Sequence, residues 1–179
     1  MYFAEENERL RRIVGRIAEA NPGRVTSRPI DALLYSVVRA VDAERVLELG
    51  AYEGTTSLYL AQGVADNGGG TLTAVELEES HARGARQHLR EAGLDDVGTV
   101  VVGDSREVVP GLDGEYDVVF VDTTPTQYHE DYANVRGALA EGGVLGVHQA
   151  LDSDGLLDEV RDDMDALVFE EYGSFLLAQ

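Results

Sequence analysis

Two glycines four residues apart, Gly50 and Gly54, follow a short apolar segment that also carries Glu48. The apolar residues of 46–49 are typical of a buried strand, and the hydroxyl residues from Thr55 onward are typical of a helix start. Glycine lets the chain turn sharply and lets a ligand approach the backbone. The spacing Glu-x-Gly-x-x-x-Gly matches neither the dinucleotide-binding loop nor the phosphate-binding loop. It therefore favours an adenosine-type ligand that lacks phosphates.

Polar residues also follow the next two apolar segments of the chain. Glu76 ends the segment 71–76, where a carboxylate can accept hydrogen bonds from both hydroxyls of a ribose. The alternative is a solvated loop acid. Asp104 and Ser105 follow the segment 97–102 and are suited either to contact adenine or to cap a helix. These two roles are compatible.

Asp122 follows the apolar run 118–121, and His148 and Gln149 end the expected strand 144–148. The Asp122 carboxylate could bind a metal, hold a sulfonium by charge or orient a substrate hydroxyl. His148 could be a general base, a metal ligand or a structural residue. Both are therefore candidate catalytic residues.

The other histidines offer weaker signals. His81 and His88 lie seven apart in a segment rich in arginine and glutamate, which predicts a solvated helix face. His129 follows Asp122 closely enough in sequence to reach the same region, but no pattern assigns it a function.

These residues need a scaffold, and strands and helices alternate along most of the chain. We expect strands at 46–49, 71–76, 97–102, 116–121 and 144–148, and helices at 3–20, after Pro29, at 55–65, 78–92, 128–140 and 153–166. Two final strands, 168–172 and 174–178, read as an antiparallel hairpin joined at Gly173. Repeated strand–helix units predict an α/β fold with a doubly wound, mostly parallel sheet and helices on both faces. Ligands of such sheets bind at the carboxyl ends of the strands.

The composition bounds the function. All 14 basic residues are arginines, against 34 acidic ones, which gives a net charge of −20. This charge disfavours nucleic acids and anionic membranes as partners, and an acidic surface suited to high salt explains it most simply. Without lysine or cysteine the chain supplies no Schiff base, thiol nucleophile or disulfide.

With 179 residues we expect one domain, comprising N-terminal helices at 1–44, a ligand-binding core at 45–149 and a C-terminal helix and hairpin at 150–179. The N-terminus lacks the pattern of a signal peptide, and no apolar segment reaches membrane-spanning length. We therefore expect a soluble, cytoplasmic protein.

Together these segments resemble class I S-adenosylmethionine-dependent methyltransferases, specifically the catechol O-methyltransferase-like group. The similarity covers residues 24–149 and keeps the motifs in order: 46–54, 73–77, 101–105, and 120–122 followed by Tyr128. The resemblance implies a Rossmann-like sheet of seven strands with the last one antiparallel. It places residues 24–26 beside the methionine moiety.

The same resemblance implies which residues bind S-adenosylmethionine. These are Glu48, Gly50, Tyr52, Gly54, Thr56, Glu76, Leu77, Asp104, Ser105, Arg106 and Asp122. Glu76 is the implied ribose ligand, and Ser105 and Arg106 are placed beside the adenine.

The chain departs from this group at the metal site. Metal-dependent members hold magnesium with the aspartate that matches Asp122 and with an Asp-Asn pair, which is His148-Gln149 here. The usual catalytic lysine is matched by Pro125. Because magnesium prefers oxygen ligands, we expect no usual magnesium site. A softer divalent ion on Asp122 and His148 remains an open alternative.

We thus expect methyl transfer to an oxygen or nitrogen of a small-molecule acceptor, with His148 taking the proton and Asp122 orienting His148 or the acceptor. The alternative is a catalytically degenerate S-adenosylmethionine-binding protein with a regulatory or assembly role. A third hypothesis, a nicotinamide dehydrogenase, is disfavoured because its dinucleotide-binding loop has a different glycine spacing. A homodimer is expected because members of the resembled group are often dimeric.

Overall fold

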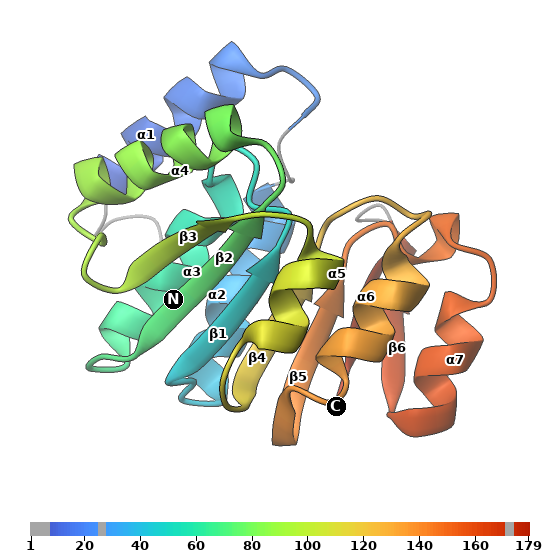
Figure 1. Cartoon of the computed structure of the whole chain (residues 1–179). Helices are drawn as coiled ribbons and strands as arrows, with labels where there is room; N and C mark the ends of the chain where they lie inside the picture. Colours follow the sequence, from blue (N-terminus) through green and yellow to red (C-terminus); the bar gives the residue numbers. More distant parts are fainter. Residues whose placement is uncertain (1–7, 25–27, 171–173) are drawn as a thin grey trace.

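The computed structural model describes residues 8–24, 28–170 and 174–179, in which helices and strands alternate (Figure 1). The helices are α1 (Glu8–Ala20), α2 (Arg28–Ala40), α3 (Thr55–Asp66), α4 (Glu79–Ala92), α5 (Ser105–Val108), α6 (Tyr128–Val135) and α7 (Leu156–Asp163), with short 3-10 turns η1 (Val109–Gly111) and η2 (Ala150–Asp152). The strands are β1 (Arg45–Leu49), β2 (Thr71–Glu76), β3 (Gly98–Val102), β4 (Tyr116–Val121), β5 (Leu139–Val147), β6 (Ala166–Phe169) and β7 (Phe175–Ala178).

The strands form one sheet in the order β3-β2-β1-β4-β5-β7-β6. The first five are parallel neighbours, and β7 runs antiparallel to both β5 and β6. Leu49 pairs with Val75 on one side and with Val121 on the other. The carboxyl ends of β1, β2 and β4 therefore lie level, and the loops that follow them meet at one edge. The doubly wound sheet predicted from the sequence is confirmed.

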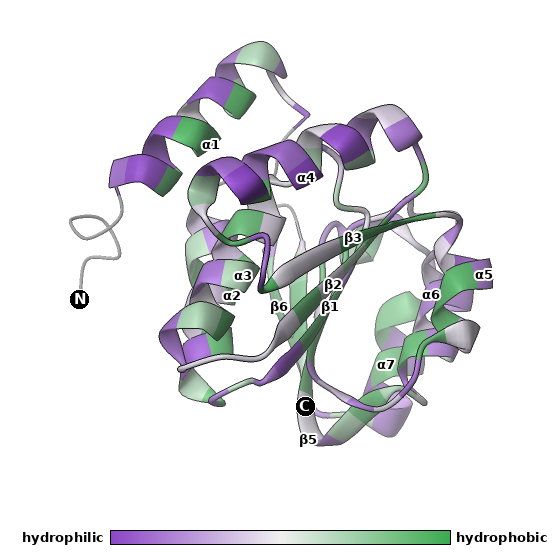
Figure 2. Cartoon of the chain, turned by 60° about the vertical axis from the view of Figure 1, so that its left-hand side comes forward, coloured by the Kyte–Doolittle hydropathy of each residue, from purple (hydrophilic) through white to green (hydrophobic). Residues whose placement is uncertain are grey.

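Helices cover both faces because successive strand residues point to opposite sides. In β1, Val46 belongs to the core beneath α1 to α4, whereas Leu47 belongs to the core beneath α6 and α7. Figure 2 shows these two groups of helices on either side of the sheet. Both Val46 and Leu47 are fully buried, so the apolar run of this strand reflects burial on two faces.

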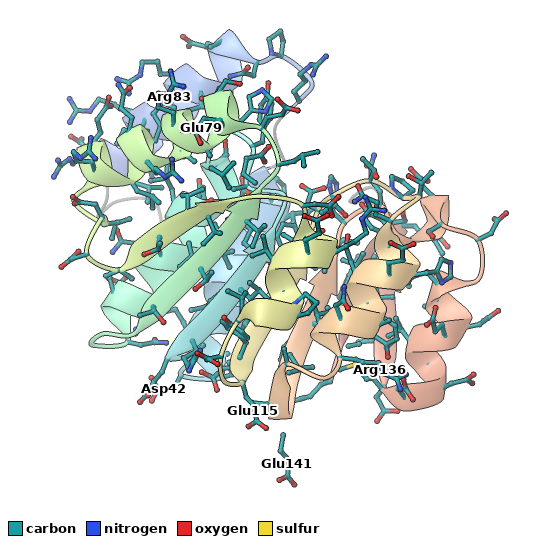
Figure 3. The ribbon with its side chains drawn as sticks, viewed as in Figure 1. Asp42, Glu79, Arg83, Glu115, Arg136 and Glu141 are labelled. Atoms are coloured by element: carbon teal, nitrogen blue, oxygen red, sulfur yellow. The ribbon has the colours of Figure 1, made fainter. Side chains whose placement is uncertain are left out.

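Charged side chains cover the outside. Glu79 and Arg83 extend from α4, and Glu115 and Glu141 extend from the edge at which β4 and β5 begin (Figure 3). No helix within the described ranges is both long and apolar enough to cross a membrane.

The sequence prediction was wrong about the end of α6 and the start of β5. The helix expected at 128–140 ends at Val135, and β5 begins at Leu139 instead of Val144. Leu139 pairs with Tyr116, and the register shifts before the next pair, Val118 with Val144. Ala138 and Leu139 favour helix locally, but strand pairing overrides that preference.

The C-terminal elements are also displaced from their predicted bounds. Helix α7 is shorter than the predicted 153–166, and β6 begins at Ala166, before the predicted strand 168–172 with which it overlaps. The antiparallel pairing of β6 with β7 is confirmed, while the turn at Gly173 lies outside the described residues. The helices expected from the sequence did not include η1, and they included α5 only as the helix that Asp104 could cap. The first residues of the helix expected at 3–20 lie outside the described residues.

Candidate functional site

Two cavities that share lining residues lie at the edge of the sheet where β1 leads into α3 and β2 leads into α4. The larger has a volume of about 470 Å³ and the smaller about 230 Å³. Both are lined by Gly50, Tyr52, Asp122 and Thr123. The glycine turn and the end of β4 therefore form the boundary between two halves of one site.

The glycine turn is compact because its backbone approaches its neighbours closely. Gly50 has φ of 90°, and a Cβ there would lie 2.2 Å from the carbonyl oxygen of Asp122. Gly54 has φ of 82°, and its Cβ would lie 2.9 Å from Cβ of Ala85. Both positions thus require glycine, on conformational and on steric grounds.

Glu76 lies at the end of β2 and is 7% exposed, so it is not a solvated loop acid. Its Oε2 accepts a 2.7 Å hydrogen bond from the Tyr52 N–H, and its Oε1 accepts a 2.9 Å bond from the Glu78 N–H. Each carboxylate oxygen can accept a second bond, so ribose hydroxyls can still be bound. The neighbouring Leu77 lines the same smaller cavity and is 59% exposed. It offers an apolar contact surface.

Tyr52 links the turn to its surroundings. It has a positive φ of 47°, and its hydroxyl donates a 2.8 Å hydrogen bond to Oδ1 of Asn21. Its ring packs against His81 with a centroid distance of 4.3 Å, and Nδ1 of His81 lies 3.6 Å from Oε1 of Glu76. The expectation that His81 lies on a solvated face was wrong, because the start of α4 turns this ring toward the site.

His88 and His129 each contact a backbone carbonyl of a neighbouring segment. Nδ1 of His88 lies 2.9 Å from the carbonyl oxygen of Glu53, so this residue too is not simply solvated. The Nε2 atom of His129 lies 3.0 Å from the carbonyl oxygen of Asp154, which ties α6 to the segment before α7. Neither histidine lines either cavity.

Asp122 and His148 form a pair at the ends of β4 and β5. His148 Nδ1 lies 2.9 Å from Oδ1 of Asp122. Burial acts to lower the pKa of His148, but the hydrogen bond and charge of Asp122, with the charges of Asp31 and Asp152, leave that pKa raised. Asp122 lines both cavities, whereas His148 lines neither and is 18% exposed. The carboxylate of the pair thus lines both cavities, and the partly exposed imidazole adjoins that carboxylate.

Glu48 and Thr56 differ in their access to the site. Glu48 is fully buried beneath the turn and lines neither cavity. It accepts a hydrogen bond from Ser57, and burial raises its pKa to about 8. Thr56 lines the larger cavity and donates a 2.9 Å hydrogen bond to Asp31. Glu48 is thus a support for the turn, and Thr56 can reach a ligand.

The segment after β3 confirms the helix-capping interpretation. The Asp104 side chain accepts a 3.0 Å hydrogen bond from the Arg106 N–H and so caps α5. The guanidinium of Arg106 also donates to both oxygens of Asp104, which lowers the pKa of that carboxyl to about 2. Asp104 and Ser105 line the smaller cavity, but Arg106 does not. Arg106 instead turns toward Asp104 and Glu130, at 3.2 Å from the latter.

Sequence reasoning missed Asp131, which is fully buried in α6. It accepts hydrogen bonds of 2.6 Å from Ser105 and from Thr123, and so joins the end of β3 to the loop after β4. Burial raises its pKa, and the two hydroxyl bonds act against that shift. The signal was present, because Asp131 shares the buried helix face of Tyr128 and Tyr132.

The donor atoms near Asp122 do not suit magnesium. Oδ1 of Asp122 lies beside Nδ1 of His148, and His148, Gln149 and Pro125 stand where the resemblance described above implies a carboxylate, an amide and a lysine. Imidazole is a poor ligand for Mg²⁺, which requires near-octahedral oxygen coordination. Among the described residues, no three His, Cys, Asp or Glu side chains are grouped so as to hold a metal ion.

Comparison with known proteins gives a consistent picture. A family model described as a methyltransferase domain matches residues 47–150. A Mycobacterium tuberculosis (strain H37Rv) relative, named as a probable O-methyltransferase, is 34% identical over 137 residues, which are 75% of this chain and 60% of the relative. A Mycobacterium ulcerans relative with a similar name is 32% identical over 158 residues, 87% of this chain and 69% of the relative. The chain spans about 60% of the length of most of these relatives.

Solved structures agree with this comparison. The O-methyltransferase TomG from Streptomyces achromogenes, solved with S-adenosylmethionine, is 25% identical with a TM-score of 0.86, covering 99% of this chain and 91% of TomG. A Podospora anserina methyltransferase solved with S-adenosylhomocysteine has a TM-score of 0.87 at 16% identity, covering 96% of this chain and 87% of its own, and supports the fold alone.

Proposed function

Because the chain belongs to the methyltransferase-domain family, we propose that it transfers a methyl group from S-adenosylmethionine to an oxygen or nitrogen of a small-molecule acceptor. An oxygen is favoured, since relatives are named as O-methyltransferases. The observation that carries the proposal is the pair of adjoining cavities that share the glycine turn and Asp122.

The smaller cavity is suited to the adenosine part of the donor. Glu76 can accept the ribose hydroxyls while it holds the turn through Tyr52. Leu77 offers an apolar surface for the base, and Asp104 and Ser105 form the polar rim. The absence of a Cβ at Gly50 lets the glycine turn pack against the backbone of Asp122, so both residues line this cavity. These residues fit a nucleoside without phosphates.

The larger cavity is suited to the remainder of the donor and to the acceptor. When bound, S-adenosylmethionine supplies a methyl group already activated by its sulfonium, so positioning contributes much of the acceleration. Asp122, at the junction of the cavities, orients the acceptor hydroxyl. His148 takes the proton at Nε2, because its Nδ1 faces Asp122, and the imidazolium is then stabilised by that carboxylate.

We further propose that this chemistry proceeds without a magnesium ion. The donor atoms at Asp122, His148 and Gln149 support that view, and a softer ion is the alternative that the experiment below tests.

The first test is calorimetric binding of S-adenosylmethionine in molar potassium chloride, before and after treatment with a chelator. We expect binding that is unchanged by the chelator. Binding that requires added metal would contradict the metal-free site, and no binding by a demonstrably folded sample would contradict the methyltransferase proposal.

A second measurement separates the enzyme from the degenerate alternative. Turnover across a panel of catechols, phenols and amines should appear with at least one acceptor, and His148→Ala should lower turnover far more than donor affinity. Binding of both S-adenosylmethionine and S-adenosylhomocysteine, without turnover on any acceptor, would support the degenerate protein instead.

We also propose a cytoplasmic location, a small-molecule acceptor and a homodimer, with neither nucleic acid nor membrane as partner. The net charge of −20 supports the exclusion of polyanions. Light scattering in high salt tests the dimer.

A further inference from the structure

Gln149 follows β5 at the edge of the sheet that carries the two cavities. Val147 of β5 pairs with Val121 of β4, and the His148 N–H donates a 3.0 Å hydrogen bond to the Val121 carbonyl. Gln149 therefore lies beside the loop that follows β4, and it lines the larger cavity together with Asp122. Within the described ranges, no hydrogen bond engages its side-chain amide. This amide thus has a donor and an acceptor available to a ligand.

The backbone of Gln149 is held in a strained conformation. Its φ of 53° lies in the left-handed region, which is unfavourable for a residue with a Cβ. The turn is fastened to the segment before β7, because the Ala150 N–H donates a 3.0 Å bond to the Ser174 carbonyl and the Leu151 N–H donates a 3.3 Å bond to Ser174 Oγ. The chain thus places a long amide side chain where glycine would be less strained, which is typical of functional sites.

The poor fit of this site to magnesium bears on the acceptor. A divalent cation coordinates several oxygens at once, so it favours an acceptor that presents two adjacent hydroxyls. Gln149 is neutral and donates from one amide nitrogen, which matches a single hydroxyl. The adjoining residue supplies a proton acceptor, since His148 is paired with Asp122 through Nδ1 and Oδ1 at 2.9 Å.

Resting on the proposed function, we propose that the Gln149 amide binds the reacting hydroxyl of the acceptor and that the acceptor is a phenol that needs only this one hydroxyl. A phenol is favoured over an aliphatic alcohol, because its hydroxyl loses a proton to imidazole more readily. Gln149 is then the residue that determines acceptor specificity.

Gln149 also positions the oxygen for the transfer. Its Nε2 donates to the acceptor oxygen while the hydroxyl proton passes to Nε2 of His148. The oxygen forms a bond to the methyl carbon as the bond between that carbon and sulfur breaks, which leaves a methyl ether, a neutral thioether and an imidazolium beside Asp122. An amide donor held in place stabilises the negative charge that develops on the oxygen.

Gln149→Gly separates this role from folding. Relief of the strained φ offsets the greater freedom of glycine in the unfolded chain, so the variant should be about as stable to denaturation as the wild-type protein. With 2-methoxyphenol as acceptor, kcat/KM should fall by about 10-fold, while affinity for S-adenosylhomocysteine changes by less than about 2-fold. Asp42→Gly is the matched control, because Asp42 has a φ of 52° and is exposed in the turn before β1 (Figure 3). It should leave turnover and affinity unchanged.

The acceptor class is tested with catechol and 2-methoxyphenol, of which the second has one free hydroxyl. After treatment with a chelator, the wild-type protein should methylate both with kcat/KM values of the same order. Calorimetry in protein saturated with S-adenosylhomocysteine should show that Gln149→Gly binds both phenols more weakly. Gln149→Asn, which keeps an amide and tolerates a positive φ, should restore part of the loss.

Four results would overturn the inference. These are unchanged turnover in Gln149→Gly, an equal loss of S-adenosylhomocysteine affinity, unfolding of this variant where Asp42→Gly is stable, and failure of the chelated wild-type protein to methylate 2-methoxyphenol although it binds S-adenosylhomocysteine. Failure of the folded wild-type protein to bind S-adenosylmethionine or S-adenosylhomocysteine would instead contradict the proposed function.

Discussion

Gly50 packs so closely against the backbone of Asp122 that a Cβ on residue 50 would lie 2.2 Å from the Asp122 carbonyl oxygen. The glycine turn and the end of β4 are therefore held in contact by the absence of a side chain. This contact fixes the place where the two cavities meet.

Gly50→Ala should therefore disturb stability and binding together. Strain at φ of 90° and the steric overlap should cost about 3 kcal/mol of unfolding free energy and weaken S-adenosylhomocysteine binding at least about 10-fold. Chemical denaturation and calorimetry measure the two effects. Gly142→Ala is the control, because it has a similar φ of 75° but open space for a Cβ. A binding loss of similar size in that variant would contradict the explanation.

Glu48→Gln should stabilise the protein at high pH. Burial raises the pKa of Glu48 from 4.5 to about 8, so the folded state keeps a proton that the unfolded state loses across this window. The wild-type protein therefore loses stability as pH rises from about 4.5 to 8. The variant does not titrate there and should be more stable by on the order of 5 kcal/mol at pH 9.

Denaturation in molar salt at pH 5 and pH 9 measures this difference. Glu141→Gln, at an exposed position of β5, keeps Glu48 and should therefore follow the pH dependence of the wild-type protein. A constant gap between Glu48→Gln and the wild-type protein at both pH values would show that Glu48 keeps an ordinary pKa.

His148→Gln should cost stability in the opposite pH range. The Asp122 carboxylate leaves the pKa of His148 raised above its ordinary 6.5, despite burial. The stabilisation from this pair is therefore fully present below about pH 6.5 and is lost as pH rises through the folded value. We expect a cost of about 1 kcal/mol at pH 6 and less at pH 9, measured by denaturation. Asp122→Asn should remove the same pH dependence, and its persistence in that variant would assign it to another group.

Leu77→Ala should weaken nucleoside binding without affecting the fold. Leu77 is 59% exposed but lines the smaller cavity, so its side chain gains burial only when a ligand is bound. We expect a loss of about 3-fold in affinity for both S-adenosylhomocysteine and 5′-methylthioadenosine. Leu167→Ala, at a 68% exposed position of β6, should change neither affinity. An equal effect of the two substitutions would place the base elsewhere.

The sequence was most informative where local and global preferences agree. The bounds 116–121 of β4 were predicted without error, because this apolar strand is buried and has turn residues before it. The glycine turn was equally clear, since its positive φ angles require residue types that are visible in the sequence. The location of Glu76 and Asp122 at one edge followed from the parallel topology alone.

What the sequence did not reveal depends on contacts between distant segments. Leu139 forms a strand because Tyr116 pairs with it, and no local pattern contains that pairing. The ring of His81, in α4, packs against the ring of Tyr52 in the glycine turn. Asn21, which follows α1, accepts a hydrogen bond from the hydroxyl of the same tyrosine. Asp131 receives hydroxyl bonds from two loops that follow different strands. Such contacts become visible only once the elements are packed.

The position of β7 between β5 and β6 sets an order of assembly. Among the described strands β6 pairs with β7 alone, so β6 joins the sheet only through the segment Phe175–Ala178, which lies beside β5. We therefore expect these last two strands to join the sheet as a unit. Hydrogen exchange of β6 and β7 should consequently report a single opening event, in which the amides of Leu176 and Val168 lose protection at the same rate.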